Sequence, residues 1–247
     1  MSTKYETIGA TYARTRRTDP RIAASIWAAL GDARTVVNVG AGTGSYEPAD
    51  RRVVAVEPSA RMIGQRPPGA PPAVQGVAEA MPFATASFDA ALAVLTMHHW
   101  TDLGAGLAEM RRVAERQVLF FFEPEYADLA WIVVDYFPEI LDQESERNAP
   151  GVADIAQHLD VVSCEPVPVP ADCIDGFGGC YWNRPEMYLD PDVQRGMSCF
   201  AQMEAHVLAR GIDRLRTELA DGTWDAKYGE LRTRPEHNLG YHVVVAR

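Results

Sequence analysis

Short apolar runs alternate with amphipathic stretches along the first half of the chain. Apolar, largely β-branched runs of strand length occupy residues 35–39, 53–56, 73–76, 88–94 and 117–122. Stretches with helical spacing of their apolar residues occupy residues 21–30, 60–65 and 102–114. Strands that alternate with helices predict an α/β fold, a Rossmann-like, doubly wound and mostly parallel sheet with both faces covered.

The final third follows a different pattern. Two further strands are expected over residues 160–169 and 239–246, and helices over 126–140, 152–159 and 197–219. These strands bring the sheet to seven, with the last one antiparallel. We expect residues 1–34 to form an N-terminal helical cap, 35–170 the core, 171–236 an insertion and 237–247 the last core strand. The insertion opens with glycines beside aromatics in Asp172–Pro185, which favours a lid over a pocket; alternatively, these aromatics only fill a satellite core.

The first crossover of the sheet is unusually short. Only eight residues, Ser45–Arg52, separate Gly44 from the second strand, and Pro48 lies among them. A parallel crossover normally needs a dozen or more residues, usually as a helix. We therefore predict a turn or short loop in place of the first crossover helix.

The most informative motif lies where the first strand ends. The apolar run stops at three glycines spaced two apart, Gly40, Gly42 and Gly44, and the next apolar run ends in Glu57. Glycines allow positive φ and close approach of the backbone to a ligand. A carboxylate at the tip of the following strand is suited to accept hydrogen bonds from ribose hydroxyls. The pattern predicts a site for an adenosine-containing cofactor, although a G-x-G alone also occurs in ordinary tight turns.

The glycine spacing narrows the choice of cofactor. A dinucleotide site has the pattern G-x-G-x-x-G, whereas here Gly44 follows Gly42 by two positions. The turn holds no basic residue for phosphate, and no Gly-Lys-Ser/Thr follows it, which excludes a P-loop. Glu57 lies 17 positions after Gly40, close to the offset of about 20 for a ribose-binding acid. A nucleoside with a non-phosphate tail, S-adenosyl-L-methionine, fits this arrangement.

The motifs downstream extend this interpretation. Val56–Ser59 precedes Met62, and Gly76–Phe83, Ser87–Ala91 and Val94–Trp100 follow in order. Together with the glycine turn, these motifs resemble class I S-adenosylmethionine-dependent methyltransferases of the type 11, small-molecule family. The resemblance covers roughly residues 35–122 and implies methyl transfer to a small molecule.

The resemblance and the turn together identify candidate cofactor ligands. In similar enzymes an N-terminal Tyr and Arg cover the cofactor, which implies Tyr12 and Arg17. Asn38 stands where the family commonly has an acid, and Val77 stands where many relatives have an acid that accepts from adenine; Glu79 is the candidate substitute for the latter. The expected cofactor-binding residues are Tyr12, Arg17, Asn38, Gly40, Ala41, Gly42, Gly44, Glu57, Pro58, Met62, Ala78, Glu79 and Leu95.

Methyl transfer depends first on positioning the acceptor next to the methyl group. A general base is needed only when the acceptor group carries a proton with a high pKa. His98 and His99, after the fourth strand, are candidate bases, with His99 favoured; either could instead only brace the turn. Glu123 follows an apolar strand, where burial would raise its pKa, but it could equally cap a helix. In the insertion, Trp182 and Arg184 could hold an acceptor. The acceptor atom stays open among O, N, C and S.

Composition limits the partners. The net charge of −11 and pI near 5.0 argue against nucleic acid. The sequence has neither a run long enough to span a membrane nor a hydrophobic secretion segment, so we expect a cytoplasmic protein, monomeric or homodimeric. The four cysteines fit no zinc pattern, and we expect free thiols and no metal. Three rival functions remain: aminopropyl transfer or other non-methylating chemistry with the same cofactor, cofactor binding without turnover, and a nicotinamide-dependent oxidoreductase, which the glycine spacing disfavours.

Overall fold

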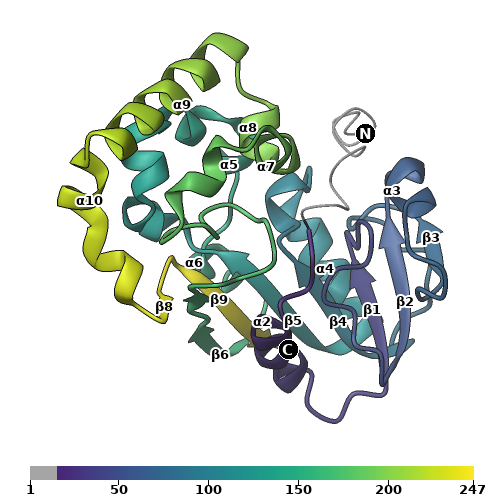
Figure 1. The fold of residues 1–247 in the computed structure, drawn as a ribbon. Coiled ribbons are helices and arrows are strands. Elements are labelled where there is room, and N and C mark those ends of the chain that lie inside the picture. Colours follow the sequence, from purple (N-terminus) through teal and green to yellow (C-terminus); the bar gives the residue numbers. More distant parts are fainter. Residues whose placement is uncertain (1–15) are drawn as a thin grey trace.

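A seven-stranded sheet forms the centre of the molecule (Figure 1). The computed structural model describes residues 16–247, and of residues 127–129 only the backbone. The strand order is β3-β2-β1-β4-β5-β9-β6, and only β9 runs antiparallel to its neighbours. The predicted fold class is confirmed. The strands are β1 (Thr35–Val39), β2 (Arg52–Glu57), β3 (Ala73–Gln75), β4 (Phe88–Val94), β5 (Ala114–Phe122), β6 (Val161–Pro166) and β9 (Tyr241–Ala246).

Both faces of the sheet are buried, as the continuous apolar strands require. Val36 and Val37 are both fully buried, yet they belong to two different hydrophobic clusters. Neighbouring side chains of a strand point to opposite faces, so the two clusters lie on the two faces of the sheet. Helix α2 (Pro20–Ala29) contributes to the first cluster and α4 (Leu103–Val113) to the second. Asp19 and Asp102 cap these helices, each accepting a hydrogen bond from a backbone N–H of the first turn.

No helix joins β1 to β2, as predicted from the short crossover. After the second strand, α3 (Ala60–Gly64) is a single short turn capped by the Ser59 side chain. The carboxyl ends of β1, β2 and β4 form one edge of the sheet, and at this edge a loop rather than a helix follows β1.

Two predicted helices are wrong. Residues 126–140 form no continuous helix: a π-helical turn, Ile132–Tyr136, lies between 3-10 turns at Pro124–Leu129 and Pro138–Asp142. Pro138 disfavours helical backbone in the residue before it, and Phe137 is accordingly non-helical, with φ −137°.

Residues 197–219 form two helices, α8 (Ser198–Ala201) and α9 (Ala205–Ala220), separated by the extended backbone of Glu204. The helix expected over 152–159 is only α6 (Val152–Ile155). The strand expected over 160–169 divides as well. β6 ends at Pro166, and β7 (Val169–Pro170) pairs instead with β8 (Glu236–His237) in a separate two-stranded ladder. This ladder joins the two ends of residues 171–236.

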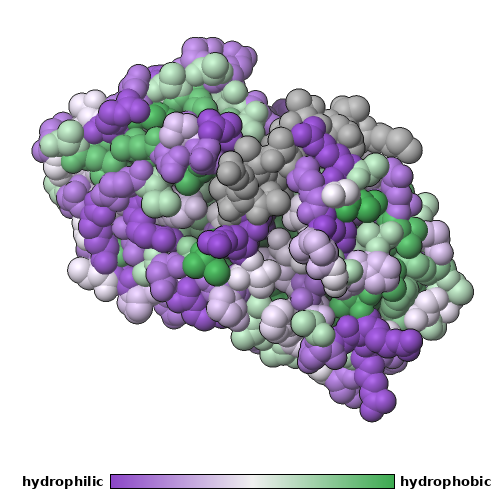
Figure 2. All heavy atoms as spheres, turned by 45° about the vertical axis from the view of Figure 1, so that its right-hand side comes forward, coloured by the Kyte–Doolittle hydropathy of each residue, from purple (hydrophilic) through white to green (hydrophobic). Residues whose placement is uncertain are grey.

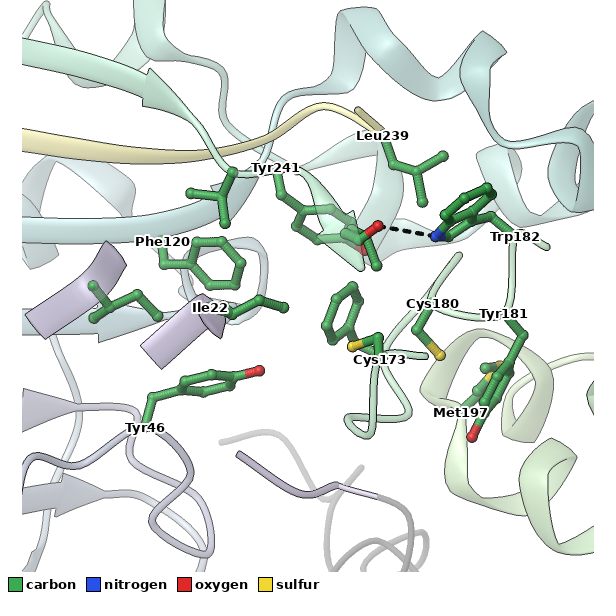
Figure 3. Packing of buried hydrophobic residues seen from close by; sticks show 14 of the residues in the cluster. Ile22, Tyr46, Phe120, Cys173, Cys180, Tyr181, Trp182, Met197, Leu239 and Tyr241 are labelled. Atoms are coloured by element: carbon green, nitrogen blue, oxygen red, sulfur yellow. Dashed lines mark hydrogen bonds between the residues drawn. The ribbon is translucent and has the colours of Figure 1, made fainter. Parts of the chain in front are cut away.

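The insertion packs against the core. Its helices α7 (Pro191–Gly196), α8, α9 and α10 (Thr223–Tyr228) gather at one end of the sheet, beyond β9, together with α5 (Glu144–Arg147) (Figure 1). One continuous hydrophobic cluster includes Ile22 of α2, Phe120 of β5, and Trp182 and Met197 of the insertion (Figure 3). On the face shown in Figure 2, hydrophilic residues predominate and hydrophobic residues lie in separate groups. Within residues 16–247, no helix has the length and apolar character that a membrane crossing needs.

Candidate functional site

The glycine turn forms a cradle at the carboxyl end of β1. Gly40 has φ +68° and Gly42 φ +54°, a region that favours glycine. A Cβ on Gly40 would lie 2.0 Å from the Thr96 hydroxyl, so the strand must carry glycine there. Among the described residues, a Cβ on Gly42 would meet only Met62 Cε, at 3.5 Å. As far as residues 16–247 are concerned, the backbone at Gly42 therefore has space beside it that a ligand can fill.

Glu57 lies against this cradle with its carboxylate fixed. One carboxylate oxygen accepts from Gly42 N at 2.8 Å and the other from Ser59 N at 2.9 Å. Burial raises the pKa of the Glu57 carboxyl above its usual value, while the two N–H groups and the charge of Arg66 act in the opposite direction. Each oxygen keeps lone-pair capacity for a further donor, as a ribose diol would supply.

A carboxylate that sequence reasoning missed lies beside Asn38. Asn38 Nδ2 donates to Glu47 Oε1 at 3.0 Å, and Arg66 Nη2 donates to Glu47 Oε2 at 2.7 Å. The Glu47 and Arg66 side chains are each 5% exposed. Relatives commonly have an acid at the position of Asn38. Here Glu47 places a carboxylate beside that position, from the loop that takes the place of the crossover helix. Only the tertiary structure brings these three residues together, because the sequence gives no sign that residues 47 and 66 meet.

The end of β4 contributes the next part of the edge. Leu95 has φ +49°, unusual for a leucine, and its N–H donates to Phe120 O at 2.8 Å. A short 3-10 turn, Met97–His99, follows. The rings of His98 and His99 lie 3.9 Å apart between centroids, and both residues are partly buried. Thr96, which precedes this turn, lies against Gly40, so the two histidines follow a residue that contacts the glycine turn.

A cavity lies between this edge and the insertion. It encloses about 150 Å³, the size of an engineered apolar cavity that holds benzene. Leu95, His98 and His99 line it on the sheet side, and Arg16 and Glu146 are its charged lining residues in the described part of the chain. The remaining lining is mostly apolar and aromatic: Met97, Phe121, Phe122, Ala130, Ile132, Val133, Ile140, Leu141, Ala149, Pro150, Gly176–Gly179, Tyr188, Gly196–Phe200, Leu239 and Tyr241.

The N-terminal candidates have separate outcomes. Tyr12 lies outside the described residues. Arg17 is exposed, and its backbone N–H donates to Asp175 at 3.2 Å. The neighbouring Arg16 lines the cavity.

The two other acidic candidates are engaged in local structure. Glu79 accepts hydrogen bonds from the backbone and hydroxyl of Thr101, at 2.7 and 2.9 Å, and Ala78 beside it is buried. Glu123 is buried and accepts from Val152 N at 2.9 Å, at the start of α6. Glu123 is not among the described residues that line the cavity.

The insertion candidates also have structural partners. Trp182 is buried and donates to Val169 O at 3.1 Å, and Arg184 donates to Cys173 O at 2.8 Å. Neither lines the cavity in the described part of the chain. Pro58 is exposed at the tip of β2, and Met62 is buried under the glycine turn.

Known proteins resemble this chain in sequence and in fold. Residues 37–122 match the model of a methyltransferase domain family. A crystal structure from Anabaena variabilis, described as a methyltransferase from an antibiotic biosynthesis pathway, is similar with a TM-score of 0.86 and 30% identity. That match covers 94% of this chain and 99% of the other.

More distant matches are weaker. A methyltransferase structure from Thermotoga maritima has a TM-score of 0.53 and 22% identity over 68% of this chain and 86% of its own, which shows a shared fold. Among curated proteins, the uncharacterized Escherichia coli protein YafE is 46% identical over 39 residues, or 16% of this chain and 19% of YafE. That stretch is too short to carry a whole protein's activity.

Proposed function

Since this chain belongs to the S-adenosylmethionine-dependent methyltransferases, we propose that it methylates an apolar small molecule held in the cavity between the sheet edge and the insertion. The observation that carries the proposal is the contact between the ends of β1 and β4. Gly40 at the end of β1 lies against Thr96, and Leu95, His98 and His99 on either side of Thr96 line the cavity. Donor and acceptor sites therefore meet at one edge of the sheet.

We further propose roles for the residues on the donor side. Glu57 accepts the ribose hydroxyls, and the backbone from Gly40 to Gly44 lies under the nucleoside. Glu47, held by Asn38 and Arg66, supplies negative charge on the side of the amino-acid tail. When bound, S-adenosylmethionine supplies a methyl group already activated by its sulfonium.

The chain's own contribution is then positioning and exclusion of water. An apolar wall orients the acceptor by burial and keeps water from the reacting atoms. His98 and His99 lie where an imidazole can accept a proton from an acceptor hydroxyl or amine. Arg16 is paired with Asp175, and the mostly apolar lining, with Glu146 as its other charged side chain in the described part of the chain, determines the choice of acceptor.

A pair of tryptophan variants tests the location of the acceptor. Val133 lines the cavity, whereas its neighbour Val134 is 47% exposed on the same turn. Both variants should keep the affinity for S-adenosylhomocysteine measured by calorimetry. With methyl-labelled donor and a panel of aromatic alcohols and amines, Val133→Trp should lose transfer and Val134→Trp should retain it.

Three results would reject this proposal. They are binding of NAD in place of S-adenosylhomocysteine, transfer only to strongly hydrophilic acceptors, and undiminished transfer by Val133→Trp. Cofactor binding without transfer to any acceptor would favour a binding protein instead.

For His99, loss of transfer in His99→Ala with retained cofactor affinity is expected if this imidazole is the base.

A further inference from the structure

A fully buried carboxylate lies outside the predicted site. Asp175 is 0% exposed and accepts hydrogen bonds from Arg16 Nε at 2.6 Å, Arg16 Nη2 at 3.2 Å, Arg17 N at 3.2 Å and Tyr46 Oη at 2.8 Å. A buried charge is tolerated only when it is paired and hydrogen-bonded, and here four donors meet both conditions. The donors come from the N-terminal segment and from the loop after the glycine turn, while Asp175 itself belongs to the insertion.

One side of this network forms the cavity wall. Arg16 lines the cavity, and so do Gly176–Gly179, which follow Asp175 directly in the chain. Glycines in a loop lose more conformational freedom on ordering than other residues. The Asp175 carboxylate fixes the start of this loop and the Arg16 side chain at once.

The other side reaches the cofactor turn. Tyr46 lies two residues after Gly44 and has φ +65°, a strained conformation for a tyrosine. Its N–H donates to Thr18 Oγ1 at 3.0 Å, its carbonyl accepts from Trp27 Nε1 at 2.8 Å, and its ring is fully buried near Phe120. In Figure 3 the Tyr46 ring points its hydroxyl toward the loop that carries Cys173.

The Tyr46 hydroxyl stays a donor at neutral pH. Burial and the adjacent Asp175 carboxylate raise the pKa of Tyr46 above its usual value, so the phenol remains protonated. A hydrogen bond from a neutral hydroxyl to a buried carboxylate is among the stronger ones in proteins. The Tyr46 side chain thus gives a hydrogen-bonded link between the loop after the glycine turn and Asp175.

We infer that Asp175 is a positioning residue that couples the cofactor turn to the wall of the acceptor cavity, through Tyr46 on one side and Arg16 with Gly176–Gly179 on the other. The inference rests on the proposed function, because it takes the glycine turn as the cofactor site. Binding of the cofactor stabilises the glycine turn and, through Tyr46 and Asp175, also orders the cavity wall. The wall then loses less conformational entropy when an acceptor binds. The two sites then bind cooperatively, with the cofactor favouring the acceptor and the acceptor favouring the cofactor.

Hydrogen exchange with and without saturating S-adenosylhomocysteine tests this coupling. In the unsubstituted protein the ligand should slow exchange both at residues 40–44 and at residues 176–180. In Tyr46→Phe, which loses only the hydroxyl, slowing at 40–44 should remain, whereas slowing at 176–180 should fall by about tenfold or more.

Tyr241→Phe is the matched control. It removes a hydroxyl that donates to Gly178 O at 2.5 Å in the same loop but does not contact the glycine turn. Its baseline exchange should rise while the ligand-dependent slowing at 176–180 persists. Asp175→Asn gives a second test, because it keeps the shape of the side chain while removing the charge, and it too should abolish the ligand-dependent slowing in the loop.

The outcomes separate this inference from the proposed function. If the ligand slows exchange at 40–44 but not at 176–180 in the unsubstituted protein, or if Tyr46→Phe leaves the slowing at 176–180 unchanged, the coupling is wrong and the cofactor site stands. If the ligand fails to slow exchange at 40–44, the proposed function and the coupling are both overturned.

Discussion

At the residue scale, the glycine turn combines a backbone constraint with an open ligand space. Gly40 is closed in by Thr96, so a side chain there would disrupt the structure itself. Among the described residues only Met62 Cε lies near a Cβ placed on Gly42, and the space beside Gly42 is the proposed cofactor site. Substitutions at these two glycines therefore have different physical consequences.

Gly42→Val should weaken S-adenosylhomocysteine binding by at least about a hundredfold, because its methyl groups occupy the ligand space, a cost of roughly 3 kcal/mol or more. Gly69→Val is the matched control: Gly69 also has a positive φ, +84°, but a Cβ there meets no atom of the described residues within 4 Å. Both variants should lose a similar amount of thermal stability from strain of about 1–2 kcal/mol. Calorimetric titration and thermal unfolding measure the two effects; equal affinities in the two variants would contradict the site.

Glu57 should give cofactor binding a pH dependence. Its raised pKa means that the carboxyl takes up a proton at a higher pH than an ordinary glutamate. Ribose hydroxyls donate best to the ionised form, so affinity for S-adenosylhomocysteine should fall as pH decreases through this pKa, approaching tenfold per pH unit below it. Calorimetry from pH 8 to pH 4.5 measures the change.

Glu57→Gln is the control for that titration. An amide cannot titrate, so the variant should bind weakly at every pH in this range. Circular dichroism at each pH verifies that the protein stays folded. An affinity that is constant to pH 4.5 in the unsubstituted protein would exclude this role for the Glu57 carboxylate.

At the element scale, a loop held by a buried ion pair takes the place of the first crossover helix. The usual crossover helix after the glycine turn would cover this side of the sheet, and here a loop does so, held by Glu47, Arg66 and Asn38. Two of the Arg66 nitrogens, Nε and Nη1, are buried and have no hydrogen-bond partner among residues 16–247. Such an arrangement is sensitive to removal of one partner, because the remaining charge stays buried.

Arg66→Met should lower the free energy of unfolding by about 3–5 kcal/mol, because it leaves the Glu47 carboxylate buried and unpaired. The double variant Arg66→Met with Glu47→Gln should recover part of that loss, since no uncompensated charge remains. Urea unfolding of the single and double variants measures the difference. If the double variant is less stable than Arg66→Met, the pairing explanation fails.

At the scale of the whole molecule, the insertion and the sheet share one core. The cluster that contains Val36 and Phe120 also contains Trp131, Trp182 and Trp224. The ladder of β7 with β8 closes the base of the insertion, and Asp175 ties its first loop to the N-terminal segment. Residues 171–236 form an insertion in the sequence, but their apolar side chains belong to the same core as the sheet.

We therefore expect sheet and insertion to unfold together. Far-ultraviolet circular dichroism follows mainly the helices and the sheet, while tryptophan fluorescence follows the cluster that holds three of the five tryptophans. The two signals should give coincident thermal transitions, as a cooperative unit requires. Two separated transitions would show that the insertion is an independently stable unit.

The sequence by itself determined most of the sheet, the glycine turn after its first strand and the short first crossover. Strands β1, β2 and β4 and the glycine motif are local features, because apolar periodicity and glycine spacing act over a few residues. The break at Phe137 has a local cause in Pro138, whereas the extended backbone of Glu204 between α8 and α9 has no such signal in the sequence. Only the tertiary structure brought Glu47 to Asn38, placed Arg16 in the lining of the cavity, and joined Asp175 to Tyr46 across 129 positions. Charges and hydroxyls on loops meet where the folded chain brings them, so a single sequence identifies the residue types but not their partners.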